Sequence, residues 1–248
     1  MVTAPRRAVV TGGGRGIGRA IAAALTRAGH EVVVLGITPE ALEETVACGD
    51  AAAWRQADVS DADSLRKGLD GLVVDVLVNN AGIAPSTPFG RTPLSMFQRV
   101  MAVNFESVVT ASQIVLPGMV ERGFGRIVSV ASVAGLKGYP YVSAYCASKH
   151  AVVGLTRSLA QEVAKTGVTV NAVCPGYVDT EMVRKGVARV VGLTGRPADD
   201  VAAEFNKGNP LGRFIEAGEV AAAVVWLASD AGAGVNGQSI AIDGGETT

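Results

Sequence analysis

The first thirty residues combine a short apolar segment, a glycine-rich turn and an amphipathic helical pattern. Residues 7–11 are typical of a buried strand, and glycines follow at positions 12, 13, 14, 16 and 18. Ile17, Ile21 and Leu25 then recur at helical spacing until Gly29. A strand that enters a helix through a glycine turn is typical of nucleotide-binding α/β domains, so this segment restricts the possible folds strongly.

The same alternation of apolar strands and helical patterns continues along the chain. Further strands are expected at residues 31–35, at a segment that ends near 57–59, and at 75–78, 125–130, 168–173 and 237–245. We therefore predict an α/β fold, a doubly wound (Rossmann) domain over residues 1–248 with a seven-stranded parallel sheet and helices on both faces. Residues 177–215 are irregular and mixed in polarity, which suits a substrate loop or lid better than a connector.

The glycine turn is expected to bind the pyrophosphate of a dinucleotide. Gly12, Gly16 and Gly18 let the backbone turn sharply, and the helix that begins near Ile17 offers unpaired N–H groups and a favourable dipole. The spacing Thr-Gly-x-x-x-Gly-x-Gly differs from the common Gly-x-Gly-x-x-Gly fingerprint. A glycine-rich loop alone is weak evidence, but its position between strand and helix favours nucleotide binding.

The end of the second strand favours NADP(H) over NAD(H). An acidic residue at this place would hydrogen-bond a ribose 2′-hydroxyl and repel a 2′-phosphate, yet no carboxylate occurs before Glu40. Arg15 in the glycine turn is placed where a guanidinium could bind a phosphate, although it could equally lie in solvent. Ile37 is not basic, which weakens the preference.

Later strand ends supply further candidates for cofactor binding. Asp58 could accept a hydrogen bond from adenine while Val59 packs on the ring, or Asp58 could cap the next helix. Asn80, Ala81 and Gly82 would let a ribose approach the backbone, and Asn79 is expected to tie strands together.

Tyr145 and Lys149 stand four residues apart in a helical pattern that runs from Tyr141 to about Ala164, so both side chains lie on one face. A phenol has a pKa of about 10, and lowering it to about 7 requires roughly 4 kcal/mol. A nearby ammonium could supply much of this in a desolvated cleft, and an oxidised nicotinamide the rest. The pair therefore predicts acid–base chemistry on a carbonyl or alcohol, although such pairs often lie on ordinary helix surfaces.

Asn104 falls inside a long helical pattern from Pro93 to about Met119. An asparagine is unfavourable there, so it either faces solvent or is kept for a function. Ser132 follows the fifth strand directly.

Composition excludes several classes of protein. The net charge of -1 gives no basic surplus for nucleic acid. No uninterrupted apolar run approaches the length of a membrane span, and Met1 to Arg7 lack the apolar core of a signal peptide. Three distant cysteines favour free thiols and a cytoplasmic location, and two histidines without clustered cysteines predict no metal site.

Taken together, these motifs resemble the short-chain dehydrogenases/reductases over essentially the whole chain. They occur in the family's order: the glycine turn, Asn80-Ala81-Gly82, Asn104, Ser132, Tyr145-x-x-x-Lys149, Pro175-Gly176 and the tail Asp243-Gly244-Gly245. Each motif is unspecific by itself, but the set in register is highly specific.

The resemblance implies a mechanism. Tyr145 would give a proton to the carbonyl oxygen as the nicotinamide delivers hydride, Ser132 would orient that oxygen, and Lys149 would bind the nicotinamide ribose and lower the tyrosine pKa. Asn104 would hold a water that relays protons to Lys149, and Thr180 would contact the carboxamide. The full set of expected cofactor contacts is Gly12, Arg15, Gly16, Ile17, Gly18, Asp58, Val59, Asn80, Ala81, Gly82, Tyr145, Lys149, Pro175, Gly176, Val178 and Thr180.

The substrate is less well defined. The resemblance points to reduction of a 3-oxoacyl thioester on an acyl carrier protein or coenzyme A, with oxidation of a secondary alcohol or 3-hydroxyacyl-coenzyme A by NAD as the alternative. Residues 164–178 also resemble aromatic polyketide ketoreductases, but Ile83-Ala84-Pro85-Ser86 lacks that group's Pro-Gly-Gly stretch. Apolar residues of the 177–215 segment suit an acyl or ring group. Its basic residues Arg184, Lys185 and Arg189 suit a coenzyme phosphate or simply a solvated face.

Two other functional classes fit the sequence less well. A nucleotide-sensing module would be favoured by loss of Tyr145 or Lys149, and both are present. A serine hydrolase would need a Gly-x-Ser-x-Gly elbow, which the chain lacks. Helix faces rich in Ala, Val and Leu, together with the resemblance, predict a homotetramer.

Overall fold

In the computed structural model, which describes residues 5–248, seven strands form one parallel sheet. Residues 1–4, part of the segment considered as a signal peptide, lie outside the described chain. The strands are β1 (Arg7–Thr11), β2 (Glu31–Gly36), β3 (Ala53–Gln56), β4 (Val76–Asn79), β5 (Gly125–Val130), β6 (Val168–Pro175) and β7 (Ser239–Ile242). Their order across the sheet is β3-β2-β1-β4-β5-β6-β7, so the predicted doubly wound fold is confirmed.

The central strands are apolar throughout because both faces of the sheet are covered. In β1, for example, Val9 and Val10 point to opposite faces and both are fully buried. Val9 pairs with Val33 of β2 and with Leu77 of β4. The continuous apolar runs of the sequence thus follow from burial on two sides.

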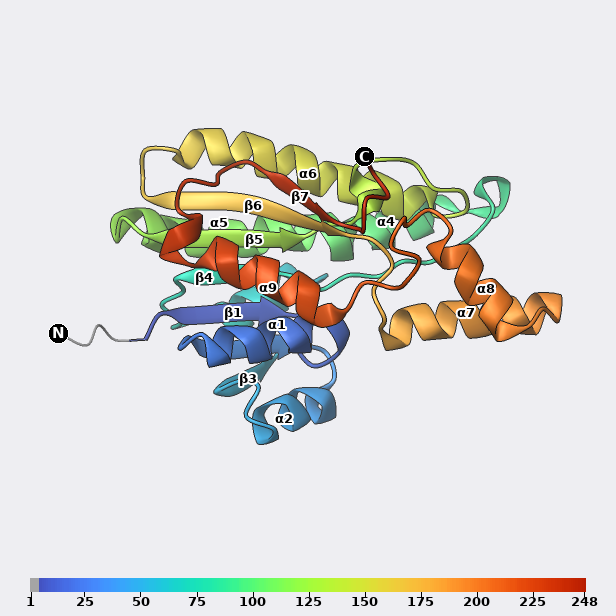
Figure 1. Ribbon diagram of the computed structural model, residues 1–248. Helices are drawn as coiled ribbons and strands as arrows, with labels where there is room; N and C mark the ends of the chain where they lie inside the picture. The colour runs from blue at the N-terminus through green and yellow to red at the C-terminus, as the bar shows by residue number, and fades with distance from the viewer. Residues whose placement is uncertain (1–4) are drawn as a thin grey trace.

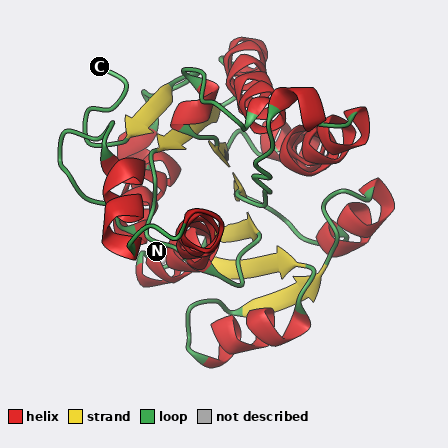
Figure 2. Ribbon diagram, turned by 90° about the vertical axis from the view of Figure 1, so that its right-hand side faces the viewer, coloured by secondary structure: helices red, strands yellow, loops and turns green. Residues whose placement is uncertain are grey.

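Helices pack on both faces of this sheet, as Figure 2 shows along the strands. They are α1 (Gly16–Arg27), α2 (Pro39–Ala47), α3 (Ala62–Leu69), α4 (Leu94–Met101), α5 (Ser107–Glu121), α6 (Ser143–Val163), α7 (Glu181–Thr194), α8 (Ala198–Asn206) and α9 (Ala217–Ala228). Short turns η1 (Phe89–Arg91), η3 (Val133–Gly135) and η4 (Asp230–Gly232) join them, and η2 (Ala102–Glu106) is a π-helical turn. Helices α1 and α9 bury Leu25 and Leu227 in one apolar core, whereas α3, α5 and α6 bury Leu65, Met119 and Val163 in the other.

The carboxyl ends of all seven strands lie at one edge of the sheet (Figure 1). The amino-terminal end of α6 and the α7–α8 pair lie at the same edge (Figure 1). The strand order reverses between β1 and β4, which is where ligands bind in open α/β sheets.

The long helix expected over residues 93–119 is interrupted. Helices α4 and α5 are joined by the π-helical turn η2, which contains Asn104. A π-helical turn inserts one residue into a helix and is frequent at functional sites. The whole segment Leu94–Glu121 is also long and apolar enough to cross a membrane, but a core helix of a soluble protein passes the same test.

The 177–215 segment is helical, which corrects the expectation of an irregular loop. Thr180 caps α7, Gly195 ends it with a φ of 68°, and α8 begins directly after Pro197. Helix α7 has no buried residue, so it lacks the apolar stripe by which a helix is found in sequence. Its position at the carboxyl edge still fits a lid.

Candidate active site

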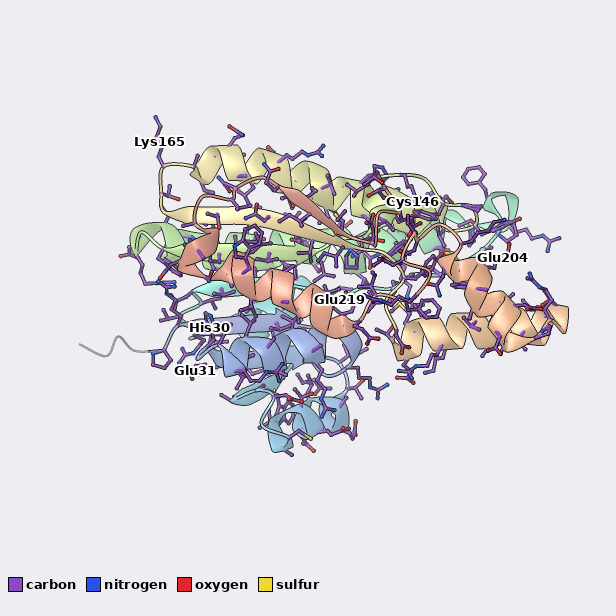
Figure 3. The ribbon with its side chains drawn as sticks, in the orientation of Figure 1. His30, Glu31, Cys146, Lys165, Glu204 and Glu219 are labelled. Atoms are coloured by element: carbon purple, nitrogen blue, oxygen red, sulfur yellow. The ribbon has the colours of Figure 1, made fainter. Side chains whose placement is uncertain are left out.

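The structure brings Ser132, Tyr145 and Lys149 together at the carboxyl edge of the sheet. Ser132 follows β5 and caps η3, and α6 carries Tyr145 and Lys149 on one face. Figure 3 labels the neighbouring Cys146 at this edge, whereas His30 and Glu31 lie toward the opposite edge.

Tyr145 is partly buried, and its hydroxyl is near Ser132. Burial raises the pKa of Tyr145 to about 12, and the nearby Ser132 side chain opposes this rise. The phenol is therefore protonated at neutral pH. Ser132 Oγ also accepts a hydrogen bond from Ala134 N at 3.1 Å, which fixes its position.

Lys149 is only 4% exposed, and its Nζ donates to Val130 O at 2.7 Å. The Nζ atom lies 5.6 Å from the centroid of the Tyr145 ring. Burial lowers the pKa of Lys149 to about 8, so the ammonium is poised to lose its proton under mildly alkaline conditions.

The sequence predicts that Lys149 and a bound oxidised nicotinamide together lower the pKa of Tyr145. Among the chain's own groups, burial is the largest influence and raises that pKa. The Nζ atom lies beside the ring and is hydrogen-bonded to a backbone carbonyl of β5, and its own pKa falls for the same reason. Desolvation thus opposes the ionised form of both residues.

Asn104 is buried, with 1% of its surface exposed, and it ties three segments together. Its Oδ1 accepts from Ile83 N at 2.8 Å, and its Nδ2 donates to Ile83 O at 2.9 Å and to Ser148 Oγ at 3.0 Å. Ser148 in turn donates to Tyr145 O at 2.8 Å. Asn104 therefore faces the protein interior and connects the segment after β4 to the Tyr145 helix.

The glycine turn is packed too closely for side chains. A Cβ on Gly18 would lie 2.2 Å from Gly12 O, and Gly12 itself has a φ of 66°. Asn80 Nδ2 donates to Thr11 O at 2.9 Å, and Thr11 Oγ1 accepts from Asn80 N and Ala81 N. The side chain of Asn80 thus braces the turn. Asn79, by contrast, is buried with Nδ2 unpartnered, so the expected tie through this amide is not seen.

A dinucleotide fits the end of α1. The helix has no side-chain cap and no acidic residue in its first turn, so its N–H groups and dipole face the cleft uncompensated. A pocket beside it is lined by Arg15, Gly36, Ile37 and Thr38 among others, with no carboxylate. The free N–H groups suit the pyrophosphate of the dinucleotide. The pocket without a carboxylate suits a 2′-phosphate on the ribose.

Arg15 also faces the α7–α8 pair. Its Nη1 lies 3.8 Å from Glu181 Oε2, with the two side chains 60% and 55% exposed. Glu181 pairs more closely with Lys185, at 2.6 Å, which lowers the Glu181 pKa. Glu181, the first residue of α7, therefore competes weakly with the expected phosphate for Arg15.

The remaining expected contacts occupy the same edge. Asp58 Oδ1 accepts from Ser60 N and Oγ, while Asp61 caps α3, so the alternative role of Asp58 as helix cap is wrong. Thr180 Oγ1 accepts from Val183 N, and its methyl group lies beside Gly16. Val59 and Val178 are buried, Ile17 is partly buried, and Gly176 follows β6 directly.

Sequence reasoning missed several residues at this edge. Ser148 is hidden inside the Tyr-x-x-x-Lys motif, although a buried serine beside Lys149 could have been suspected. Tyr177 packs on Phe205 of α8, with ring centroids 5.0 Å apart and an interplanar angle of 59°. Glu246 reaches the edge from the tail, and no local pattern signals this.

Comparison with known proteins gives the family. Residues 6–190 match the family model for short chain dehydrogenases. The chain belongs to this family, as the fold and the arrangement of Ser132, Tyr145 and Lys149 lead one to expect, and it is an oxidoreductase.

Similar proteins differ in the substrates for which they are named. The chain is 37% identical to an acetoacetyl-CoA reductase of Shinella zoogloeoides, covering 97% of this chain and 98% of that one. It is 39% identical to a cis-4-hydroxycyclohexanecarboxylate dehydrogenase of Sinomonas cyclohexanicum, covering 98% and 97%. The crystal structure of a variant of the actinorhodin polyketide ketoreductase with NADPH matches all of both chains at 34% identity and a TM-score of 0.93.

Proposed function

We propose that this protein is an NADP(H)-dependent reductase that converts a ketone to a secondary alcohol. The observation that carries the proposal is geometric: the Tyr145 hydroxyl lies near Ser132, and the buried Lys149 stands one turn further along α6 with its Nζ 5.6 Å from the Tyr145 ring centroid. Burial favours the neutral phenol, which is the form that gives a proton to a carbonyl oxygen.

Each residue has a distinct role in this proposal. The nicotinamide would supply the hydride. Ser132 orients the carbonyl oxygen and Tyr145 donates the proton to it. Lys149 would hold the nicotinamide ribose, and a water held by Asn104 would link Lys149 to bulk solvent so that the proton given by Tyr145 is replaced. Asn104 positions α6 against the segment after β4, in addition to the proposed water relay.

NADP(H) is preferred over NAD(H) because the pocket after β2 has no carboxylate and includes Arg15. The remaining contacts are proposed for Gly12, Gly16, Ile17, Gly18, Asp58, Val59, Asn80, Ala81, Gly82, Pro175, Gly176, Val178 and Thr180. The NADPH complex of the actinorhodin ketoreductase supports this choice for a chain of the same fold.

For the substrate we propose a 3-oxoacyl thioester or a related ketone. The acetoacetyl-CoA reductase of Shinella supports a thioester, and Met182 and Leu193 of α7 are exposed apolar residues suited to an acyl chain. The second candidate is oxidation of a secondary alcohol with NAD. The name of the cis-4-hydroxycyclohexanecarboxylate dehydrogenase supports the alcohol, and says nothing of the cofactor. A polyketide ketone is the third, by likeness to the actinorhodin enzyme.

We further propose that the α7–α8 pair acts as the substrate lid of a homotetramer in the cytoplasm. Cys48, Cys146 and Cys174 are free thiols, which suits a reducing compartment.

Steady-state rates with both cofactors test the proposal. Acetoacetyl-CoA, a bicyclic ketone and a simple aryl ketone are each reduced with NADPH and with NADH, and the matching alcohols are oxidised with NADP and NAD. The highest kcat/KM is expected for acetoacetyl-CoA with NADPH. A preference for an alcohol with NAD would favour the second candidate.

A further inference from the structure

The tail after β7 folds back into the carboxyl edge of the sheet. Asp243 is buried, and its carboxylate accepts hydrogen bonds from Gly245 N, Thr247 N and Thr247 Oγ1. These bonds hold residues 243–248 in a tight turn with Gly244 at a φ of 67°. The turn places the next acidic side chain, Glu246, against the loop that leads into α6.

The Glu246 side chain is only 5% exposed, and it is held by two residues of that loop. Oε1 accepts a hydrogen bond from the Tyr139 hydroxyl and lies 3.2 Å from Lys137 Nζ. Lys137 Nζ also donates to Glu246 O at 3.0 Å. A buried carboxylate is retained where a cation and a hydrogen-bond donor compensate its desolvation, and both conditions hold here.

The same turn packs on the end of the α7–α8 pair. A Cβ built on Gly208, just after α8, would lie 3.1 Å from Glu246 Oε1, and one on Gly245 would lie 3.4 Å from the Pro210 ring. Asn209, which lies between Gly208 and Pro210 in the chain, is buried and packs against Gly244. The chain that returns from α8 is therefore seated directly on the tail.

The cluster also adjoins the chain segment just before Tyr177. A Cβ built on Gly176 would lie 3.4 Å from Glu246 Oε2. Tyr177 packs on Phe205 of α8, with ring centroids 5.0 Å apart and an interplanar angle of 59°. The Glu246 carboxylate thus lies against the end of β6, next to the residue that contacts α8.

We propose that Glu246 is a positioning residue for substrate binding, which clamps the return of the α7–α8 pair onto the Lys137–Tyr139 loop. The proposal rests on the proposed lid function of α7–α8. Removing the carboxylate leaves Lys137 and Tyr139 without their buried partner and separates the lid from the loop before α6. Of the proposed cofactor contacts, Gly176 adjoins the cluster, since a Cβ built on it would lie 3.4 Å from Glu246 Oε2. The glycine turn and the pocket after β2 have no part in the cluster, so we expect cofactor binding to change little.

The test compares Glu246→Ala and Glu246→Gln with Glu204→Gln. Glu204 is a matched control, since it is a carboxylate on α8 (Figure 3) whose ion-pair partner, Arg196 at 2.9 Å, is not a member of the cluster. Three quantities are measured: amide hydrogen exchange over residues 181–210, the NADPH Kd by fluorescence titration, and kcat and KM separately for the best ketone.

For Glu246→Ala we expect faster exchange confined to residues 181–210 and a KM raised about tenfold, as befits the loss of a hydrogen-bonded charge. The NADPH Kd and kcat should stay within about threefold. Glu246→Gln should lie between this variant and wild type, because its amide oxygen still accepts from Tyr139. Glu204→Gln should match wild type.

The proposal is overturned if Glu246→Ala leaves exchange and KM unchanged. It is also overturned if exchange rises throughout the protein and the NADPH Kd rises with it, since that result would show a general structural role. Exchange is read without substrate, so failure of the proposed ketone reduction would show in the wild-type rates and not in this comparison.

Discussion

Lys149 shows how burial and function compete at a single residue. The ammonium is enclosed at the end of β5, and its compensation within the chain is the carbonyl of Val130. A charged group that is desolvated in this way costs the folded state free energy while it stays protonated. An apolar side chain could be buried here at a lower cost in folding free energy. We therefore attribute the presence of a lysine to its role in the site.

This cost makes the stability depend on pH. Below pH 8 the lysine is protonated in both folded and unfolded chains, and the full cost is present. Between about 8 and the ordinary pKa of 10.5 the folded chain loses this proton first, so stability rises with pH. Relative to Lys149→Met, the wild type should gain about 2 kcal/mol of unfolding free energy between pH 7.5 and 9.5.

Urea denaturation of both proteins at the two pH values measures this difference. Other titrating groups are shared by the two chains and cancel in the comparison. A difference that stays constant with pH would mean that Lys149 titrates near its ordinary value.

At the scale of elements, the glycine turn and α7 meet across the cofactor region through Arg15 and Glu181. The turn was predictable from sequence, because its glycines and the strand before it are adjacent in the chain. The contact between this turn and α7 was not predictable, because the two segments are far apart in the chain and no local sequence pattern indicates a tertiary contact. For the same reason the sequence pattern around Asn104 predicts plain helix where the structure has a π-helical turn.

Arg15→Ala should weaken NADPH binding about tenfold or more and change NADH binding much less, because a hydrogen-bonded charge on the 2′-phosphate is lost. Glu181→Gln is the opposing control. It removes an exposed competitor for Arg15, so NADPH binding should stay equal or tighten by a few fold at most. Fluorescence titration with each cofactor gives the four constants, and an equal loss for NADPH and NADH would contradict the proposed role of Arg15.

For the molecule as a whole, the sheet order and the two cores follow from hydrophobic patterns that are strong in sequence. Strand ends shifted by a residue or more: β6 continues to Pro175 and β3 ends at Gln56. The tail is recognisable as a motif, but its return to the site through Glu246 depends on tertiary packing alone. Helix α7 was missed because it contributes nothing to the core.

The whole chain is expected to assemble as a homotetramer. Val120 of α5 and Trp226 of α9 are large apolar residues that remain exposed in the single chain. Light scattering coupled to size exclusion should give four times the chain mass of 25.3 kDa. A monomer at micromolar concentration would contradict the prediction.

Tyr145→Phe tests the central claim most directly, because it removes one hydroxyl and keeps the ring. With the ketone and cofactor that the wild type uses best, we expect kcat to fall by at least about a hundredfold, as for loss of a positioned acid. The cofactor Kd should stay within about twofold. Turnover close to that of the wild type would show that the proton reaches the carbonyl oxygen from another group.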